Sequence, residues 1–279
     1  MGSFWKWWQT IPYRTDPDII SIAGFQLKYY GLMYILAFGL TFYLLNYRIK
    51  KNEYSLKKEL LENYFFYVIV FVLLGGRLGY VVFYNLSYFI KNPLEIFLPF
   101  SFKDGVEFTG IAGMSYHGAL LAAVAGTYFF AKKNSVDFLH FSDFVVTAAP
   151  LGYTFGRLGN FINGELYGRV TEMSFGMYFP MAGDGLLRHP SQLYEAFFEG
   201  VFIFGVLWMI RNKEFPRGFL MSLYLIMYGT VRFFIEFLRE PDEHIGFFMS
   251  WMTIGQILCL LMIVSGVLII FFQKKKAAV

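Results

Sequence analysis

The stretch GRLGNFINGELYGR, residues 156–169, gathers groups that can hold an anion at the end of a long apolar run. On a helix, Arg157 and Asn160 share a face because they lie three residues apart, and Asn163 continues this face. Guanidinium and amide groups are donors well suited to phosphate. An alternative interpretation is helix packing through small residues, with one arginine reaching an interface. That alternative does not account for the asparagines and Glu165.

A second charged stripe occurs in YGTVRFFIEFLREPD, where Arg232, Glu236 and Arg239 are spaced by four and then three residues. This spacing places all three side chains on one helical face. Arg232 and Glu236 can form an internal ion pair that keeps the segment neutral. Alternatively, the two arginines exceed what Glu236 neutralises, and the surplus positive charge holds an anion.

Three further ionisable residues lie at the starts of apolar runs. His117 in GMSYHGA has the side chain of a general base, although a single histidine is also often a packing residue. Glu195 and Glu199 in RHPSQLYEAFFEG share a helical face, and either can serve as a counter-ion for the arginines.

Composition identifies the solvent around these groups. The 279 residues are 57% hydrophobic and only 16% charged, whereas a soluble domain carries about 25% charged residues. The mean hydropathy is +0.48, so we predict a polytopic membrane protein. A net charge of +4 gives no indication of nucleic-acid binding. The single cysteine, Cys259, lies in an apolar run, so any reacting thiol should come from a substrate.

Crossing a bilayer takes about 20 apolar residues. We predict an all-α protein with about seven transmembrane helices, near residues 29–47, 63–85, 112–131, 138–160, 193–210, 218–238 and 249–273. Most Lys and Arg residues in the connections follow the first, third, fifth and seventh spans. The positive-inside rule therefore predicts an external N-terminus and a cytoplasmic C-terminus.

The simplest domain division is one transmembrane catalytic domain over residues 1–279. Its N-terminal segment, residues 1–28, contains a tryptophan cluster typical of a membrane interface. Residues 86–111 and 161–192 are expected to face outwards. The charged groups lie mainly near the outer ends of the spans, which predicts a site towards the outer face of the membrane. A lipid headgroup is the nearest source of phosphate there.

These motifs carry a family resemblance. GRLGNFINGELYGR closely resembles the signature of the bacterial phosphatidylglycerol–prolipoprotein diacylglyceryl transferases. Further motifs occur in the family's order, namely KYYGLMY (28–34), GGRLGYVVFY (75–84), GMSYHGA (113–119), RHPSQLYEA (188–196), YGTVRFFIEFLREPD (228–242) and WMTIGQIL (251–258). The resemblance covers roughly residues 24–258.

The resemblance implies a function and a location. The enzyme would transfer the diacylglyceryl group of phosphatidylglycerol to the lipobox cysteine of a prolipoprotein signal peptide, forming a thioether and releasing glycerol phosphate. It would be a multi-pass protein of the bacterial cytoplasmic (inner) membrane. Its partners would be these two substrates and membrane lipid, without nucleic acid, and we expect no cofactor or metal.

The resemblance also implies the site residues. The expected catalytic residues are His117, Arg157, Arg232 and Arg239. The expected substrate-binding residues are Tyr30, Arg157, Asn160, Asn163, Glu165, Gly168 and Glu236. Two other functions remain as alternatives. An anion transporter would place polar residues along a whole path to the inner face, whereas the inner halves of most spans are apolar here. A non-catalytic scaffold would have no need of His117.

Overall fold

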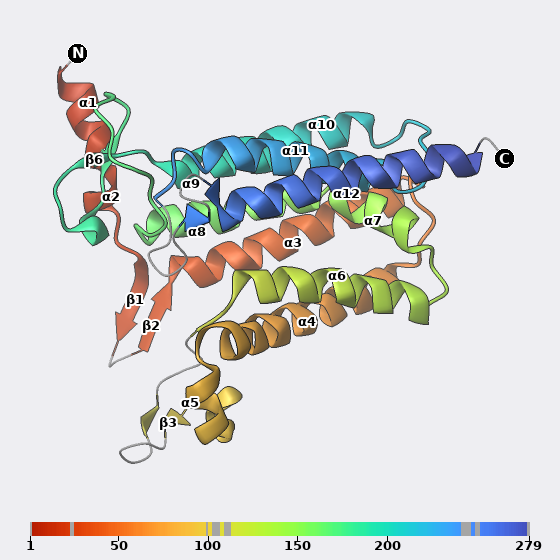
Figure 1. Ribbon diagram of the computed structural model, residues 1–279, viewed down its shortest axis with the longest axis horizontal. Coiled ribbons are helices and arrows are strands. Elements are labelled where there is room, and N and C mark those ends of the chain that lie inside the picture. Colours follow the sequence, from red (N-terminus) through yellow and green to blue (C-terminus); the bar gives the residue numbers. More distant parts are fainter. Residues whose placement is uncertain are drawn as a thin grey trace. The chain divides into compact units, whose positions relative to one another are not determined.

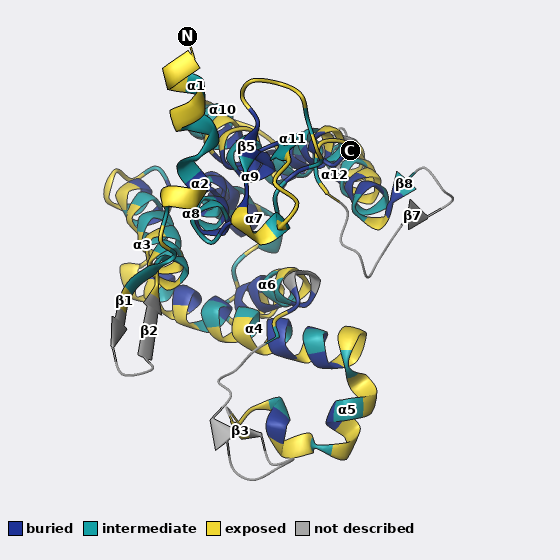
Figure 2. Ribbon diagram, turned by 90° about the vertical axis from the view of Figure 1, so that its left-hand side faces the viewer, coloured by how far each residue is buried: buried dark blue, intermediate teal, exposed yellow. Residues whose placement is uncertain are grey.

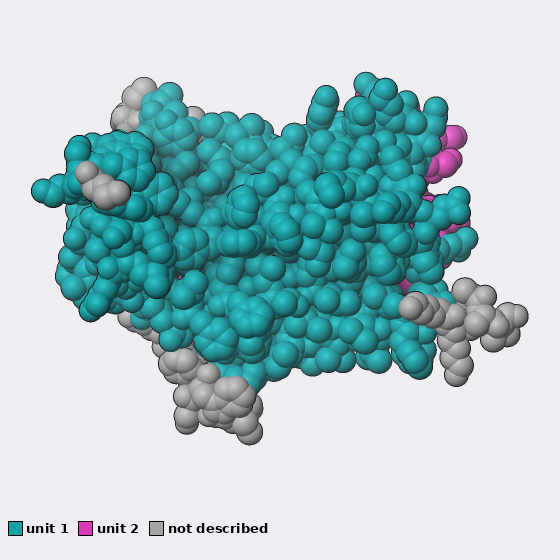
Figure 3. All heavy atoms as spheres, turned by 90° about the horizontal axis from the view of Figure 1, so that it is seen from above, with its two compact units in different colours: residues 1–54, 142–279 teal, residues 55–141 magenta. Residues whose placement is uncertain are grey.

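The computed structural model describes residues 2–22, 25–98, 100–101, 107–108, 113–240, 247–248 and 252–277. The chain is mostly helical, as predicted, and short two-stranded hairpins occur outside the long helices (Figure 1). The all-α prediction omitted these hairpins. The chain forms two compact units, coloured separately in Figure 3: residues 1–54 with 142–279, called unit 1, and residues 55–141, called unit 2.

Unit 1 holds most of the helices. They are α1 (Gly2–Gln9), α2 (Ile11–Arg14), α3 (Tyr29–Lys50), α8 (Ala149–Ile162), α9 (Ser191–Tyr194), α10 (Ile203–Ile210), α11 (Phe219–Ile235) and α12 (Ile254–Ala277). A π-helix, η3 (Glu195–Phe202), joins α9 to α10, and a 3₁₀ turn, η2, covers Pro180–Ala182. Helix α8 packs against α3, α9 and η3, while α11 packs against η3, α10 and α12.

The hairpins of unit 1 are short and antiparallel. They pair β1 (Asp18–Ile22) with β2 (Phe25–Lys28), β5 (Met177–Tyr178) with β6 (Leu187–Arg188), and β7 (Phe247–Phe248) with β8 (Met252–Thr253). Between α10 and α11 lies an apolar core that includes Ile203, Leu207 and Leu220. This core holds the helices that carry the charged residues.

Unit 2 is built around two long helices. Its elements are α4 (Lys58–Tyr84), α5 (Leu86–Lys91), the 3₁₀ turn η1 (Pro93–Ile96), the hairpin of β3 (Phe100–Ser101) and β4 (Glu107–Phe108), and α6 (Tyr116–Lys133). Glycines let α4 and α6 approach closely. A Cβ on Gly118 would lie 2.3 Å from the carbonyl oxygen of Gly75 and 2.8 Å from the Cα of Gly79. This is the small-residue packing typical of membrane helices.

Within the described residues, four helical segments are long and apolar enough to cross a membrane. They are Tyr29–Lys50, Lys58–Tyr84, Ser191–Ile210 and Ile254–Gln273. They carry large exposed apolar side chains, among them Phe66 and Met209, which are 73% and 78% exposed; Figure 2 shows exposed residues along α3 and α4. Such faces suit lipid rather than water. The protein is therefore a multi-pass membrane protein, and each of the seven predicted stretches contains helix.

The fourth predicted stretch, residues 138–160, is divided into two helices. Helix α7 (Phe138–Val146), which crosses the boundary between the units, ends four residues before Pro150, and α8 begins at Ala149. Proline cannot donate a backbone hydrogen bond, and its ring clashes with the carbonyl four residues earlier. The Thr147 hydroxyl stabilises the break by donating to the Phe144 carbonyl at 2.7 Å.

The π-helix η3 widens the segment that carries Glu195 and Glu199. A π-turn shifts the backbone hydrogen bonds by one residue and is frequent at functional sites. The Thr154 hydroxyl of α8 donates to the Ala196 carbonyl at 3.2 Å. Close contact of the two segments depends on Gly200, where a Cβ would lie 2.0 Å from the Thr154 hydroxyl oxygen. Helix α8 and η3 are thereby held in a fixed register.

Candidate active site

Two arginines from different helices meet at one glutamate. Arg157 of α8 places its Nε 2.7 Å from one carboxylate oxygen of Glu195, and Arg232 of α11 places a terminal nitrogen 2.8 Å from the other. Glu195 is completely buried, and the two arginines are 8% and 9% exposed. The carboxylate therefore bridges α8 and α11 inside unit 1, where water screens the charges little.

The second terminal nitrogen of Arg232 contacts Glu236, the residue that follows α11. This nitrogen donates to the Glu236 carboxylate at 2.9 Å, which confirms the ion pair suggested by the four-residue spacing. The Thr253 hydroxyl donates to the same carboxylate at 3.0 Å. Thr253 also forms a reciprocal cap with Gln256 at the start of α12, with both hydrogen bonds at 3.1 Å. The start of α12 thus helps to orient Glu236.

Tyr153 connects Arg157 to a second buried glutamate. Its hydroxyl accepts a hydrogen bond from the Arg157 Nε at 2.6 Å and donates to Glu199 at 2.5 Å. The guanidinium carbon of Arg157 also lies 4.8 Å from the centre of the Tyr153 ring. Glu199, which is completely buried, lies 3.7 Å from a terminal nitrogen of Arg232. Tyr153 and Glu199 therefore belong to the same cluster.

A chain of amides extends from Arg157 towards the end of α8. A terminal nitrogen of Arg157 donates to the Asn160 side-chain oxygen at 3.3 Å, as the three-residue spacing predicted. The Asn160 amide donates to Glu165 at 2.8 Å, and the Asn163 amide donates to the same oxygen at 3.4 Å. The Gln192 amide fixes this loop from α9 by donating to the Glu165 carbonyl at 2.6 Å.

Gly168 allows three backbone segments to meet beside the cluster. It pairs with Arg239 in an antiparallel bridge and donates its N–H to the His189 carbonyl at 2.8 Å. A Cβ at this position would lie 2.4 Å from the Leu238 carbonyl oxygen and 2.7 Å from the His189 Cβ. Burial lowers the pKa of the His189 imidazole, since it disfavours the charged form. Arg239 interacts electrostatically with Glu195.

An exposed ion-pair network covers the outside of the Gly168 bridge. Arg188 lies 2.6 Å from Asp184 and 2.9 Å from Glu240, and its guanidinium also donates to the Gly168 carbonyl at 3.2 Å. The hydrogen bonds from Arg188 hold the pKa of Asp184 below its usual value. Arg188 is the first residue of the motif RHPSQLYEA and was not among the expected site residues.

Tyr30 and His117 are the remaining expected site residues. The Tyr30 ring in α3 packs near Gly159, whose Cβ position would be 3.1 Å from the ring, and its hydroxyl interacts with Asn160 and Glu165. His117 is the second residue of α6 in unit 2. Its side chain lies outside the described residues. The structure thus joins the other expected residues in unit 1 and borders them with Tyr30.

The arginines of the cluster have more acidic partners than the alternative with surplus positive charge assumed. Sequence inspection weighed a surplus of positive charge in the stripe that contains Arg232, but Glu195 and Glu199 come from another helix and add two carboxylates. These two residues were noted as counter-ions and were left out of the expected site, as was Tyr153. Charged residues spaced by four within an apolar run were the available signal.

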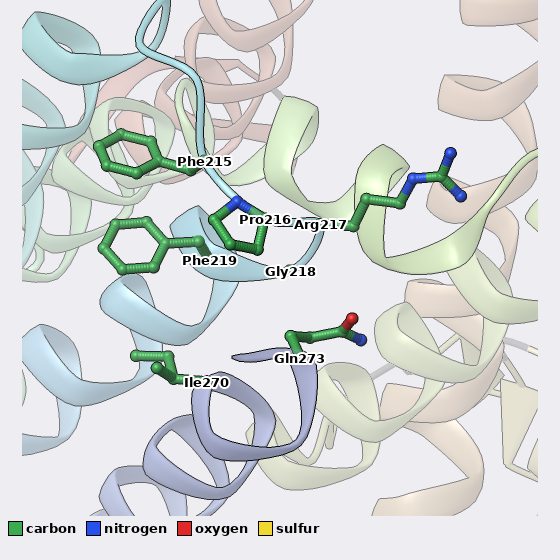
Figure 4. Close-up of a pocket in the computed structure, with 7 residues that line it drawn as sticks. All are labelled: Phe215, Pro216, Arg217, Gly218, Phe219, Ile270 and Gln273. Carbon is green, nitrogen blue, oxygen red and sulfur yellow. The ribbon is translucent and has the colours of Figure 1, made fainter. Parts of the chain in front are cut away.

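The opposite end of unit 1 contains a separate ion-pair network and an apolar hollow. Arg48 and Arg211 share the carboxylate of Glu53, at 3.3 and 2.9 Å, and tie α3 to the end of α10. An apolar hollow at this end is shown in Figure 4, lined by Phe215, Pro216, Arg217, Gly218, Phe219, Ile270 and Gln273. Phe219 begins α11, and Arg232 follows 13 residues later. At 1.5 Å per residue this is a distance of about 20 Å, so the hollow lies away from the arginine–glutamate cluster.

Fold and site together define a class: a multi-pass helical membrane protein with a buried cluster of arginines and glutamates. The comparisons identify its family. Residues 17–272 match the family model described as prolipoprotein diacylglyceryl transferase. The chain therefore belongs to the prolipoprotein diacylglyceryl transferase family.

Curated relatives agree along nearly the whole chain. A phosphatidylglycerol–prolipoprotein diacylglyceryl transferase of Chlorobaculum tepidum is 48% identical, covering 99% of this chain and 96% of its own length. Proteins of the same name from Campylobacter lari and Desulfotalea psychrophila are each 42% identical over 271 residues. The alignment with the Campylobacter lari protein covers 96% of this chain and 97% of that relative. The alignment with the Desulfotalea psychrophila protein covers 94% of this chain and 96% of that relative.

Proposed function

We propose that the buried arginine–glutamate cluster holds the headgroup phosphate of phosphatidylglycerol while the diacylglyceryl group is transferred. The family and the names of its members indicate the reaction: this chain is a transferase that acts on phosphatidylglycerol and a prolipoprotein in the first step of lipoprotein maturation. The observation that supports our placement of the reaction is the bridge from Arg157 through Glu195 to Arg232.

The reaction creates charge where these arginines lie. The sulfur of the substrate cysteine attacks the glycerol carbon, a carbon–sulfur bond forms, and the carbon–oxygen bond to phosphate breaks. The leaving glycerol phosphate keeps the bonding electrons, so negative charge grows on its oxygens. Fixed guanidinium groups in a buried site stabilise such charge without reorganising. We assign this role to Arg157 and Arg232, with Arg239 in support.

Neighbouring polar groups would orient the lipid and the arginines. Asn160 and Asn163 are suited to hydrogen-bond the headgroup, and Glu165 holds both amides in place. Glu236 fixes the terminal nitrogen of Arg232. Tyr30 borders the amides from α3, and Gly168 permits the backbone contact with Arg239.

The proton of the substrate thiol needs an acceptor. A free cysteine has a pKa of about 8.5, and a neutral imidazole is a suitable base at neutral pH. We assign the base to His117. His117 is the second residue of α6 and therefore belongs to unit 2. The catalytic domain would then comprise the whole chain, residues 1–279.

We further propose seven spans in the bacterial cytoplasmic (inner) membrane, with the N-terminus outside and the C-terminus in the cytoplasm. The distribution of Lys and Arg supports this orientation. The cluster would then lie towards the outer face, where a secreted prolipoprotein presents its lipobox cysteine.

The assignment of the arginines is tested by transfer from labelled phosphatidylglycerol to a lipobox peptide, using purified full-length enzyme. Arg157→Ala and Arg232→Ala should each lower the rate by about 10²–10³. Arg157→Lys keeps the charge but loses the forked geometry, and we expect it to remain impaired. Arg14→Ala, at an exposed position in α2, is the control. Near-normal rates in folded alanine variants would rule out this role for the arginines.

A further inference from the structure

The buried cluster has no surplus of positive charge with which to receive an anion. Arg157 and Arg232 contact three carboxylates, those of Glu195, Glu199 and Glu236. All three are at most 8% exposed. Arg239 contributes one more positive charge through its interaction with Glu195. The charges therefore at most balance before any lipid arrives.

A phosphodiester headgroup adds one negative charge to this balanced and buried set. An uncompensated buried charge is costly, and closely spaced carboxylates relieve such a cost when one of them binds a proton. The guanidinium groups remain charged, since arginine is effectively always protonated in proteins. Compensation for the incoming phosphate must therefore come from a carboxylate.

The contacts single out one of the three carboxylates. Glu195 is held by two guanidinium nitrogens at 2.7 and 2.8 Å. Glu236 has Arg232 at 2.9 Å and the Thr253 hydroxyl at 3.0 Å. Glu199 lies farther from its arginine, at 3.7 Å, and its closer partner is the neutral hydroxyl of Tyr153. Glu199 consequently loses the least ion-pair energy when it becomes neutral.

Groups from several helices face Glu199 and set the environment of its proton. They are Tyr153 and Arg157 of α8, Arg232 of α11, Cys259 of α12, and Glu195 of its own helix. Tyr228 of α11 interacts with Arg232. A protonated Glu199 can still accept the Tyr153 hydrogen bond on its carbonyl oxygen. Protonation therefore preserves the link from Glu199 through Tyr153 to Arg157.

We infer that Glu199 takes up a proton from solvent when phosphatidylglycerol binds, and that this residue sets the affinity of the site for its anionic lipid. The inference rests on the proposed headgroup site. An oxygen–hydrogen bond forms on the Glu199 carboxylate, whose negative charge is lost as the phosphate charge enters. Glu199 acts through Tyr153 and Arg157, so it is a positioning residue.

Calorimetry tests the inference on the full chain in detergent, with short-chain phosphatidylglycerol as the probe. Binding heats are compared in buffers of different ionisation enthalpy from about pH 6 to about pH 9. The phosphodiester itself stays anionic, so a buffer-dependent heat reports protons bound by the protein. We expect uptake that rises to about one proton per lipid, and an affinity that falls by up to about tenfold per pH unit on the alkaline side.

Glu199→Gln is the decisive variant because the amide mimics the neutral acid. It should bind the lipid without proton uptake and with an affinity independent of pH. Glu62→Gln is the control: Glu62 pairs with Lys58 at 2.9 Å on the exposed surface of α4 and should leave the uptake unchanged. Binding by the wild type without proton uptake at any pH overturns the inference, as does unchanged uptake in Glu199→Gln.

Tyr153→Phe provides a second variant should Glu199→Gln not fold. Loss of the hydroxyl removes a hydrogen bond to the charged form of Glu199, so maximum uptake should move to higher pH. An unmoved maximum contradicts the assignment to Glu199. The headgroup site itself is tested separately: if Arg157→Ala and Arg232→Ala bind the lipid as the wild type does, the proposed function fails, whatever the proton count.

Discussion

The Glu195 carboxylate fixes the separation of two guanidinium groups that would otherwise repel each other. Each oxygen contacts a different arginine, and the side chain is completely buried. A phosphate that reaches Arg157 and Arg232 therefore meets groups whose orientation is already set. Such preorganisation makes electrostatic stabilisation effective, because little rearrangement is needed as charge develops.

His189 should make the region around Gly168 sensitive to acid, because its backbone pairs with Gly168. Burial places the folded-state pKa of its imidazole below the unfolded value of 6.5. The folded chain therefore binds a proton at His189 less tightly than the unfolded chain does. The neutral imidazole contributes fully to the stability of the fold above pH 6.5, and this contribution declines as the pH falls through that value. We expect acidification from about pH 7.5 to about pH 5 to lower the unfolding temperature of the wild type more than that of His189→Gln. Parallel pH profiles in detergent would contradict this prediction.

Contacts within one helix were predictable from the sequence, whereas contacts between helices were not. The pairs Arg232–Glu236 and Arg157–Asn160 follow from spacings of four and three residues, and the structure confirms both. The bridging position of Glu195 depends on how η3 is rotated against α8 and α11. Apolar residues surround membrane helices on most sides, so hydropathy gives little information about that rotation.

Backbone approach at Gly168 determines how the loop after α8 meets the end of α11. Gly168→Ala would place its Cβ 2.4 Å from the Leu238 carbonyl oxygen. We expect a loss of about 1–3 kcal/mol in stability, as for other overpacked sites, together with weaker transfer activity because Arg239 shifts. Thermal unfolding and the transfer assay measure the two effects.

Gly156 is the matched control in the same sequence motif. A Cβ there meets no atom within 4 Å, and alanine favours the helix by up to about 1 kcal/mol over glycine. Gly156→Ala should therefore leave the unfolding temperature unchanged or raise it. Equal destabilisation by both substitutions would show that the close backbone contact at Gly168 is not the cause of the lost stability.

The positions of the helices were predictable, but their irregularities were only partly so. Each apolar stretch contains helix, because about 20 residues without charge runs leave few alternatives in a membrane. Pro150 was visible in the sequence and accounts for the break between α7 and α8. No residue type in the sequence predicts the π-turn of η3, in which Gly200 lies against Thr154 of α8.

For the whole molecule, the predicted orientation is open to a direct test with cysteine substitutions. Cys259, the single native cysteine, is buried, so it should contribute little background. An impermeant maleimide should label Met181→Cys in intact spheroplasts, because residues 161–192 are predicted to face outwards. Lys213→Cys, in a predicted cytoplasmic turn, should react only after permeabilisation. The reverse pattern would invert the topology and move the cluster to the cytoplasmic face.

A one-residue deletion in the π-helix η3 would disturb the cluster without preventing insertion of the segment into the membrane. With the remaining hydrogen-bond pattern kept, removal of one residue within η3 would turn the residues after it by about 100° relative to those before it. The shortened segment would still be apolar and would still enter the bilayer, yet Ile203 and Leu207 would not keep their places in the core while Glu195 contacts both arginines. In this span, the number of residues between Glu195 and Leu207 matters for the arrangement of the cluster independently of hydrophobicity.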